Sequence, residues 1–401
     1  MSPTLLPRAG RAQDVGVHAP PTPTLAELTA DPHPALAALR SRQPVSWVEA
    51  VGGWMVLSYD LAVQVMRDAD TFTVDDPRFT TSRVVGRSML STDGEEHRRH
   101  RSPFIAPFTP RATRETFAAF VENEADRLVA GLAARNAAEL RTAVAGPMAV
   151  ACMRFALGLE QLPVDLLLGW YRDIVGAVDG LTPDAAVPPS GLSAYGELST
   201  AVLDAAARSA SPFLAGIVGG ADALSPEELA GNVAVLLFGG IETTEGMIAN
   251  LLFHLFTTPG ALTVSSDAAA RRAALQDALE ESLRLEPAAA EVDRYATRDV
   301  EIGGASVRRG DLVIVSLTAA NRDPAVFADP DAFRPGRENG RRHLAFAQGP
   351  HICPGLHLAR LETLTLLDRL LRLPGFRPAA GLTPPTGLVF RKPLAVPAVW
   401  S

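Results

Sequence analysis

One long helical pattern constrains the fold of this 401-residue sequence more than any other feature. Ser225-Pro226-Glu227-Glu228 combines a capping box with proline at the first helical position, and no helix stop follows until Thr258-Pro259-Gly260. Such a helix is roughly 50 Å long, enough to cross a domain of this size. Because it is apolar on nearly all sides, it predicts a helix buried in the centre of a large core.

Two glycines interrupt the middle of this helix, in Phe238-Gly239-Gly240-Ile241-Glu242-Thr243-Thr244-Glu245. Each costs about 1 kcal/mol relative to alanine in a helix, so the pair requires an explanation. Close packing against another helix, or a kink, is one explanation. The other is that the glycines open the helix for a flat cofactor and dioxygen, with Glu242 and Thr243 beside them as a proton relay.

The second informative stretch runs from Phe346 to Arg360 and places Cys353 in a loop rich in Gly and Pro. From Pro354 onward the pattern predicts an amphipathic helix, and the N-terminus of a helix lowers the pKa of a nearby cysteine. A buried structural cysteine is the alternative. The other cysteine, Cys152, lies in an apolar segment and is interpreted as core, and two cysteines so far apart favour a reducing compartment.

The pattern Phe-x-x-Gly-x-His-x-Cys-x-Gly, from Phe346 to Gly355, resembles the haem-binding loop of the cytochrome P450 superfamily. Gly239 to Thr243 resemble that family's oxygen-activation signature, Ala/Gly-Gly-x-Asp/Glu-Thr. The resemblance extends from Pro34 to the C-terminus. It implies a mainly helical fold with a smaller β region, a triangular helical prism around one buried haem b.

By this resemblance, Cys353 is the expected axial ligand of the haem iron. Phe346 would pack over the proximal side, and Gly349 and Gly355 would let backbone approach the sulfur. The propionate-binding residues implied by the family motifs are His97, Arg101, Arg294 and His351.

One residue departs from the family pattern. Pro354 stands where the family usually has an aliphatic residue whose N–H points towards the sulfur, and proline has no N–H. We therefore expect one fewer hydrogen bond to the thiolate and a more negative reduction potential.

The resemblance also assigns the remaining candidate residues. Gly239 and Gly240 would adjoin the haem, Thr243 would hydrogen-bond dioxygen and water, and Glu242 would supply protons from solvent. The substrate-pocket candidates are Val235, Phe238, Ala290 and Val292, of which Phe238 is equally a candidate core residue. Glu281, Arg284 and Arg337 would form a buried structural brace, although a surface ion pair is the default for a Glu and an Arg three residues apart.

Outside these motifs we expect a flexible arm over 1–25 and a single domain over 26–401. A hairpin is predicted over 45–59, a helix over 61–67, loop over 72–91, and mainly helix over 112–216 with breaks near 163 and over 179–191. The net charge of −8 argues against nucleic acid as a general partner. The first residues contain no apolar run, so we expect a cytoplasmic, monomeric protein without a membrane anchor. Lys392 is the only lysine, which is attributed to base composition.

The expected function is insertion of one oxygen atom from O2 into a hydrophobic or amphipathic small molecule, by hydroxylation or epoxidation. Electrons would come from NAD(P)H through a separate ferredoxin and ferredoxin reductase. A basic docking face for the ferredoxin and scattered surface arginines are equally good interpretations of Arg98, Arg99, Arg341, Arg342 and Arg360. Desaturation, coupling or nitration remain open, as does a non-catalytic haem-binding or partner-stabilising protein.

Overall fold

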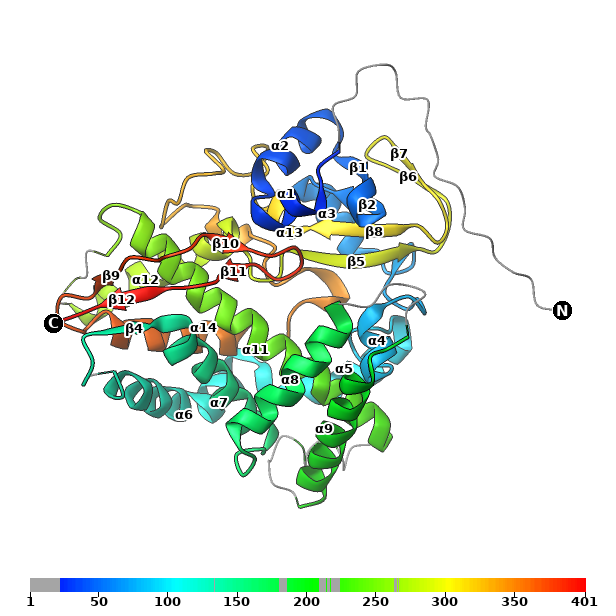
Figure 1. The fold of residues 1–401 in the computed structure, drawn as a ribbon. Helices are drawn as coiled ribbons and strands as arrows, with labels where there is room; N and C mark the ends of the chain where they lie inside the picture. The colour runs from blue at the N-terminus through cyan, green and yellow to red at the C-terminus, as the bar shows by residue number, and fades with distance from the viewer. Residues whose placement is uncertain are drawn as a thin grey trace.

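The structure, a computed structural model, describes residues 22–132, 134–179, 186–208, 214, 217, 224–262, 265 and 267–401. The predicted central helix is present as α11, Pro226–Thr257, and it crosses the middle of the molecule (Figure 1). The capping box is complete, since the Glu228 N–H donates to Ser225 Oγ and the Ser225 N–H donates to Glu228 Oε2. The sequence signals at both ends of this helix therefore predicted its bounds correctly.

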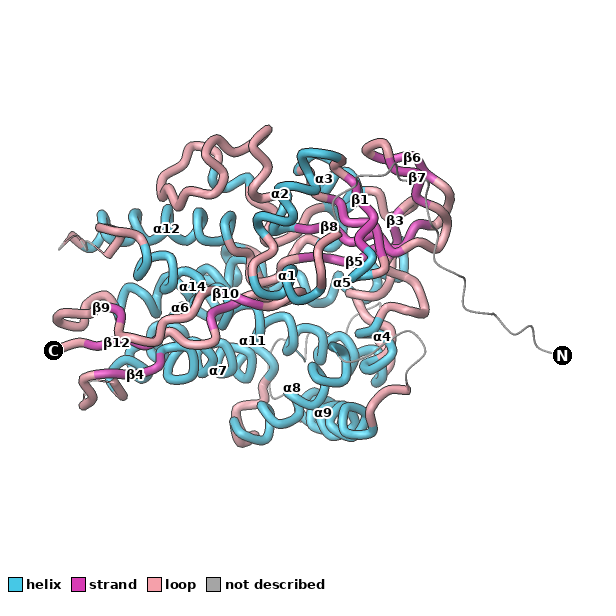
Figure 2. Tube along the Cα trace, turned by 45° about the horizontal axis from the view of Figure 1, so that its top comes forward, coloured by secondary structure: helices cyan, strands magenta, loops and turns pink. Residues whose placement is uncertain are grey.

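Helices surround α11 on most sides and supply the largest hydrophobic core. In the views of Figures 1 and 2, α6 and α7 lie on one side of it and α8 and α9 cover its N-terminal half. The bounds are α4 Thr80–Val85, α5 Gly94–Ile105, α6 Pro110–Ala130, α7 Gly146–Leu157, α8 Val164–Asp179, α9 Pro189–Ala207, α12 Ala268–Leu285 and α14 Leu356–Leu370.

The β region is small, and its largest part lies at one corner of the molecule (Figure 1). Its main sheet has the order β1-β2-β8-β5-β3, in which only β2 and β8 run parallel. These strands are β1 Val45–Val48, β2 Gly53–Val56, β3 Phe72–Thr73, β5 Glu291–Ala296 and β8 Leu312–Ser316. Helices α1 Leu25–Ala30, α2 His33–Arg42, α3 Tyr59–Arg67 and α13 Leu317–Ala320 pack around the sheet.

Three minor sheets complete the fold. They are the pair β6 Val300–Ile302 with β7 Ala305–Val307, the pair β10 Pro385–Thr386 with β11 Lys392–Pro393, and the order β4-β12-β9 formed by Ala137–Glu139, Pro397–Val399 and Arg377–Pro378. The turn between β10 and β11 returns the chain to the middle of α11.

Most local predictions are confirmed, and the exceptions have simple causes. The predicted hairpin is β1-β2, turning through Gly52 in the left-handed region. The predicted loop over 72–91 contains the helix α4, whose apolar side packs into the core. The helix after the cysteine begins at Leu356 and not at Pro354, because Gly355 is its N-cap. Residues 1–21 of the expected arm lie outside the described residues, and Thr24 already caps α1.

Within the part of the chain that the structure describes, α11 is the one helix long and apolar enough to cross a membrane. Of its most apolar window, 67% is buried inside the protein. Its apolar surface is thus explained by its place in the core.

Candidate active site

The loop that carries Cys353 is folded tightly between η4 Gly340–Arg342 and α14. The Cys353 N–H donates to the Phe346 carbonyl over 2.9 Å, which closes the loop into a ring. Phe346 is held from outside by Arg360, whose guanidinium lies 4.4 Å from the ring centre. This arrangement fixes Phe346 within the loop of Cys353, and its role in shielding the sulfur stays a prediction.

The two glycines of this loop have different surroundings. Gly349 has a φ of +73°, and a Cβ there would lie 2.5 Å from the Met66 carbonyl oxygen. A Cβ on Gly355 would meet Cys353 Sγ at 4.0 Å, an ordinary contact. Gly349 therefore permits close approach to α3 and not to the sulfur, which corrects the reason given for it from sequence.

Backbone amides face the Cys353 thiol. Burial raises the pKa of this thiol above its usual value, whereas the N–H groups of Gly355 and Leu356 and the charges of Arg101 and Arg360 lower it. The residue between them in sequence, Pro354, has no N–H to contribute. The departure noted in the sequence thus leaves two backbone donors near the sulfur.

Basic side chains from three separate segments meet beside this loop. The rings of His97 on α5 and His351 lie 4.3 Å apart, and Arg101, one turn further along α5, donates to the Ile352 carbonyl. Arg294 on β5 is 4% exposed, and only its Nη1 has a partner, the Asp293 carbonyl at 2.7 Å. The structure brings together all four residues predicted from sequence to bind propionates.

This basic group is short of hydrogen-bond acceptors. Asp93 accepts from His351 Nε2 over 2.9 Å, but the buried His97 Nε2 and Arg294 Nη2 have no hydrogen-bond partner among the residues that the structure describes. Burial, together with the nearby charges of His351 and Arg101, lowers the pKa of His97 to about 4. Buried donors without acceptors are rare and costly, so the group fits an anionic ligand that supplies the missing acceptors.

The two glycines of α11 also differ from each other. Gly239 is exposed although it lies in the middle of the helix, and a Cβ there would meet nothing within 4 Å. A Cβ on Gly240 would lie 2.3 Å from Met153 Sδ of α7. The cofactor explanation therefore fits Gly239, whereas helix packing explains Gly240.

Thr243 and Glu242 point to different partners. The Thr243 hydroxyl donates to the Gly239 carbonyl, one turn back in the same helix. Glu242 forms an ion pair with Lys392 of β11, with 2.6 Å between Oε1 and Nζ, and its Oε2 accepts from the Tyr171 hydroxyl of α8. Lys392 and Tyr171 were not recognised in the sequence, although a solitary lysine was a signal that could have singled out the first of them.

The four pocket candidates fall into two groups, those beside the turn before β11 and those in the packed cores. Phe238 is half-buried and forms an edge-to-face pair with Phe390, with ring centres 5.2 Å apart. The Ala290 N–H donates to the Val389 carbonyl over 2.8 Å, which brings the start of β5 to the same turn. Val235 and Val292 belong to the packed cores around α11 and the main sheet. Phe390 is a pocket candidate that no local pattern revealed.

The predicted structural brace is assembled and buried. Glu281 and Arg284 are 1% and 0% exposed and form a two-pronged pair, at 2.9 Å to Nε and 2.8 Å to Nη2. Arg337 Nε lies 3.2 Å from Glu281 Oε1. Arg284 also donates to the carbonyls of Asn321, Pro330 and Ala332, so it joins α12 to the loop before the cysteine.

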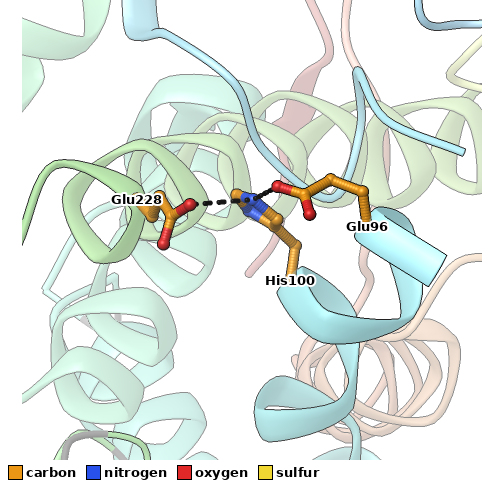
Figure 3. A group of neighbouring side chains, drawn as sticks. All are labelled: Glu96, His100 and Glu228. Carbon is orange, nitrogen blue, oxygen red and sulfur yellow. Dashed lines mark hydrogen bonds and ion pairs between the residues drawn. The ribbon is translucent and has the colours of Figure 1, made fainter. Parts of the chain in front are cut away.

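One further cluster of possible ligands occurs among the described residues, formed by Glu96, His100 and Glu228 (Figure 3). Arg99 already supplies a cation there, since its Nη2 lies 2.9 Å from Glu96 Oε1 and also binds Glu228 Oε1. Asn232 donates to His100 Nδ1, which leaves Nε2–H to donate to Glu96. The polar groups of this cluster thus have their partners already. We call Glu96, His100 and Glu228 the clasp, since they join α5 to the N-terminus of α11.

Comparisons with known proteins agree with this geometry. The sequence profile of the family "Cytochrome P450" matches residues 212–384. Nocardicin C N-oxygenase from Nocardia uniformis subsp. tsuyamanensis is 31% identical over 393 residues, covering 92% of this chain and 96% of that protein. The chain belongs to the cytochrome P450 superfamily.

Other cytochromes P450 show how far the likeness extends. Mycinamicin IV hydroxylase/epoxidase from Micromonospora griseorubida is 31% identical and covers 90% of this chain and 94% of that protein. The crystal structure of P450BioI with an acyl carrier protein ligated to hexadec-9Z-enoic acid has a TM-score of 0.84 and 26% identity, over 92% of this chain and 99% of that one. The protein is therefore a P450 monooxygenase with the P450 fold.

Cytochromes P450 bind haem, and the residues present fit that group. Haem has two propionates, and the unpartnered donors of His97 and Arg294 are an anion site. The exposed Gly239 leaves open space beside α11 in which a flat ring could lie. A buried thiol with backbone donors completes the set of groups that the cofactor requires.

Proposed function

We propose that this cytochrome P450 inserts one oxygen atom from O2 into a hydrophobic or amphipathic small molecule of secondary metabolism. The observation that carries the proposal is the acceptor-poor basic group beside the Cys353 loop, and the exposed Gly239 in an otherwise buried helix supports it. Relatives named for the oxidation of nocardicin C and mycinamicin IV support a metabolite of this kind. Half-buried apolar side chains such as Phe238 and Phe390 support an apolar pocket.

The proposed residues have distinct tasks. Cys353 would hold the haem iron as a thiolate, while His97, Arg101, Arg294 and His351 would hold the propionates. When bound, the haem activates dioxygen by reduction. The family resemblance assigns Phe346 to shielding the sulfur and the brace of Glu281, Arg284 and Arg337 to the proximal side.

Proton supply is the task of α11 in this proposal. Converting R–H and O2 into R–OH and H2O consumes two electrons and two protons, which must reach a site closed to bulk water. Thr243 would hold the last proton donor in place, and Glu242 would carry protons to it. General acid catalysis of this kind contributes typically about 10²- to 10⁴-fold to a rate.

We further propose that electrons come from NAD(P)H through a ferredoxin and its reductase, with docking at the exposed arginines. Arg341 and Arg342 are exposed. Arg98 is exposed but pairs with Glu95. Arg99 binds Glu96 and Glu228, the two acids drawn in Figure 3. Arg360 binds Glu280 at 2.7 Å. Arg341 and Arg342 are therefore the residues of the five with which a docking experiment should start.

An optical titration of the ferric holoprotein tests the substrate proposal. The panel would contain macrolides, β-lactam peptides, terpenoids, free fatty acids and an acyl carrier protein loaded with a fatty acid. Saturable conversion from low to high spin with one free class supports the proposal and names the class. Conversion with the loaded carrier protein alone would overturn it in favour of a carrier-bound substrate, as in the P450BioI complex.

Thr243→Ala tests the proton relay. We expect a larger share of electrons to appear as hydrogen peroxide, because the variant lacks the hydroxyl that holds the final donor. The measurement is peroxide formed per NAD(P)H oxidised, with Thr257→Ala at the end of α11 as a control. An unchanged ratio in Thr243→Ala would contradict the assignment.

A further inference from the structure

Lys392 is the only lysine in a chain whose other basic residues, histidine aside, are all arginine. Its ammonium nitrogen lies 2.6 Å from Glu242 Oε1 and 3.4 Å from Glu245 Oε2. All three side chains are largely buried, at 17%, 15% and 12% exposure. The solitary lysine thus bridges the candidate proton carrier and a second acid one turn further along α11.

Close packing brings β11 to this part of α11. A Cβ on Gly246 would lie 2.9 Å from Ala288 Cβ and 3.7 Å from Lys392 Cβ, so only a glycine allows the approach. Asn250 strengthens the contact by donating to the carbonyls of Glu286 and Arg391. The packing of these two elements therefore holds the Lys392 backbone close to Glu242 and Glu245.

The bridge belongs to a balanced group of charges. Glu245 also accepts from Arg141 Nη1 over 2.8 Å, and Arg141 Nε donates to the Leu394 carbonyl. Two acids face two bases, and Arg141, at 27% exposure, connects the group to the surface. When one of the two acids is neutral, Lys392 therefore still has the other acid as its charged partner.

Glu242 is held away from Thr243 in this arrangement. Consecutive residues of a helix point about 100° apart, and the Thr243 hydroxyl is turned to the Gly239 carbonyl. Both oxygens of Glu242 are bound, one to Lys392 and one to the Tyr171 hydroxyl. To carry a proton to Thr243, the Glu242 carboxylate must leave the Lys392 ammonium. Glu245 is near enough to become the new partner of that ammonium.

We propose that Lys392 is a positioning residue that holds Glu242 retracted and releases it by moving to Glu245. In each cycle Glu242 gains one proton from a hydronium ion, which becomes water. The neutral carboxyl turns to Thr243 and gives that proton to the water held there, which passes a proton on to the oxygen being reduced. The carboxylate then returns to Lys392. The inference rests on the role of Glu242 proposed above.

Lysine suits this exchange better than arginine. An ammonium is a compact charge on a flexible stem with three donors, whereas a guanidinium binds a carboxylate with two prongs in a fixed plane. An arginine at this position would retain the charge and lose the easy transfer between two acids. A purely structural ion pair would have no such preference.

A solitary lysine permits a test that needs no variant. Protein grown with lysine labelled at the ε-carbon with ¹³C has one side-chain ε signal, that of Lys392. We expect this signal to show relaxation from exchange between two partners on the microsecond to millisecond timescale, and to lose it in Glu245→Gln. A wild-type signal without an exchange contribution would overturn the proposal.

Turnover gives the second test. The holoenzyme is assayed with a ferredoxin and its reductase, and no substrate is added. Lys392→Met and Lys392→Arg should both raise peroxide per NAD(P)H severalfold and change its pH profile, whereas Arg111→Met in an exposed ion pair should not. Rescue by Lys392→Arg would show a structural role and overturn the inference.

Glu242→Gln separates the two proposals. If this variant raises peroxide but both Lys392 variants behave as wild type, the relay stands and the inference about Lys392 fails. If Glu242→Gln has no effect, the proposed relay fails and the role of Lys392 fails with it. If Glu242→Gln and both lysine variants raise peroxide, both proposals are supported.

Discussion

Single residues in this protein differ most through the partners that tertiary packing gives them. Glu281 and Glu362 are both buried acids on helices, at 1% and 3% exposure. Glu281 faces Arg284 and Arg337, whereas Glu362 has no ion pair among the described residues and burial raises its pKa well above the usual value. The first acid is part of a charged brace, and burial favours the neutral form of the second.

Substitution with glutamine should separate these two acids. Glu281→Gln leaves Arg284 buried without its counter-ion, so we expect a loss of about 3–5 kcal/mol in the free energy of unfolding. Glu362→Gln breaks no ion pair among the described residues, so we expect a smaller loss at pH 7. Urea titrations followed by circular dichroism measure both, and a comparable loss in both variants would contradict the argument.

Pro354 allows a prediction about the thiolate. Pro354→Leu restores a backbone N–H next to Gly355 and Leu356, whose amides already face the sulfur. An added donor stabilises negative charge on sulfur, so the haem reduction potential should become less negative. A redox titration of the two holoproteins measures the shift, and Pro397→Leu in β12 serves as a remote control. A more negative potential in Pro354→Leu would refute the expectation.

At the scale of elements, α11 combines a packing surface and a cofactor surface within two adjacent residues. Gly240 packs against Met153 of α7, and Gly239 faces open space. The neighbouring helices orient α11 so that Gly240 faces α7 and Gly239 faces open space. The clasp of Glu96, His100 and Glu228 (Figure 3) then joins its N-terminus to α5, which carries His97 and Arg101, and Arg99 binds both acids of the clasp.

Alanine at each glycine should therefore act differently. Gly240→Ala forces Met153 to move, so we expect the apoprotein to lose about 1–3 kcal/mol of stability. Gly239→Ala has no such clash and gains helix propensity of up to ~1 kcal/mol, and haem occupancy should be retained because the family signature allows alanine at this position. Urea unfolding of the apoproteins and the Soret absorbance after haem titration measure the two effects. Equal stability losses in both variants would contradict the assignment.

On the scale of the whole molecule, Glu286 connects parts of the chain that are distant in sequence. It follows α12, is 4% exposed, and binds Arg391 Nε at 2.5 Å and His33 Nε2 of α2 at 2.9 Å. Burial alone would raise its pKa, but the hydrogen bond from His33 and the charges of His33, Arg391 and Arg322 lower it to about 2. The β region and the helical region are tied together at this carboxylate.

The acid dependence of folding should reflect this carboxylate. Because its folded pKa lies below the ordinary value of 4.5, its contribution is present above that pH and is lost as pH falls towards about 2. Glu286→Gln should be less stable than wild type at pH 7, and the difference should shrink below pH 4.5. Urea titrations from pH 7 downward check this, with the exposed Glu301→Gln as control. A difference independent of pH would contradict it.

The sequence by itself determined the elements and motifs whose signals are local. The capping box of α11, the hairpin β1-β2 and the loop of Cys353 each depend on residues a few positions apart, so the chain alone specifies them. The resemblance then predicted the haem residues, since the fixed spacings around Cys353 and Thr243 lie within single segments.

Only the tertiary structure decided which long-range partners these residues have. Gly239 and Gly240 are identical in sequence, yet one meets open space and the other Met153. Lys392 is 150 residues from Glu242, and Phe390 is equally remote from Phe238, so no periodicity connects them. Local patterns encode the conformation of a segment, but charge pairing and packing depend on which surfaces the completed fold brings into contact.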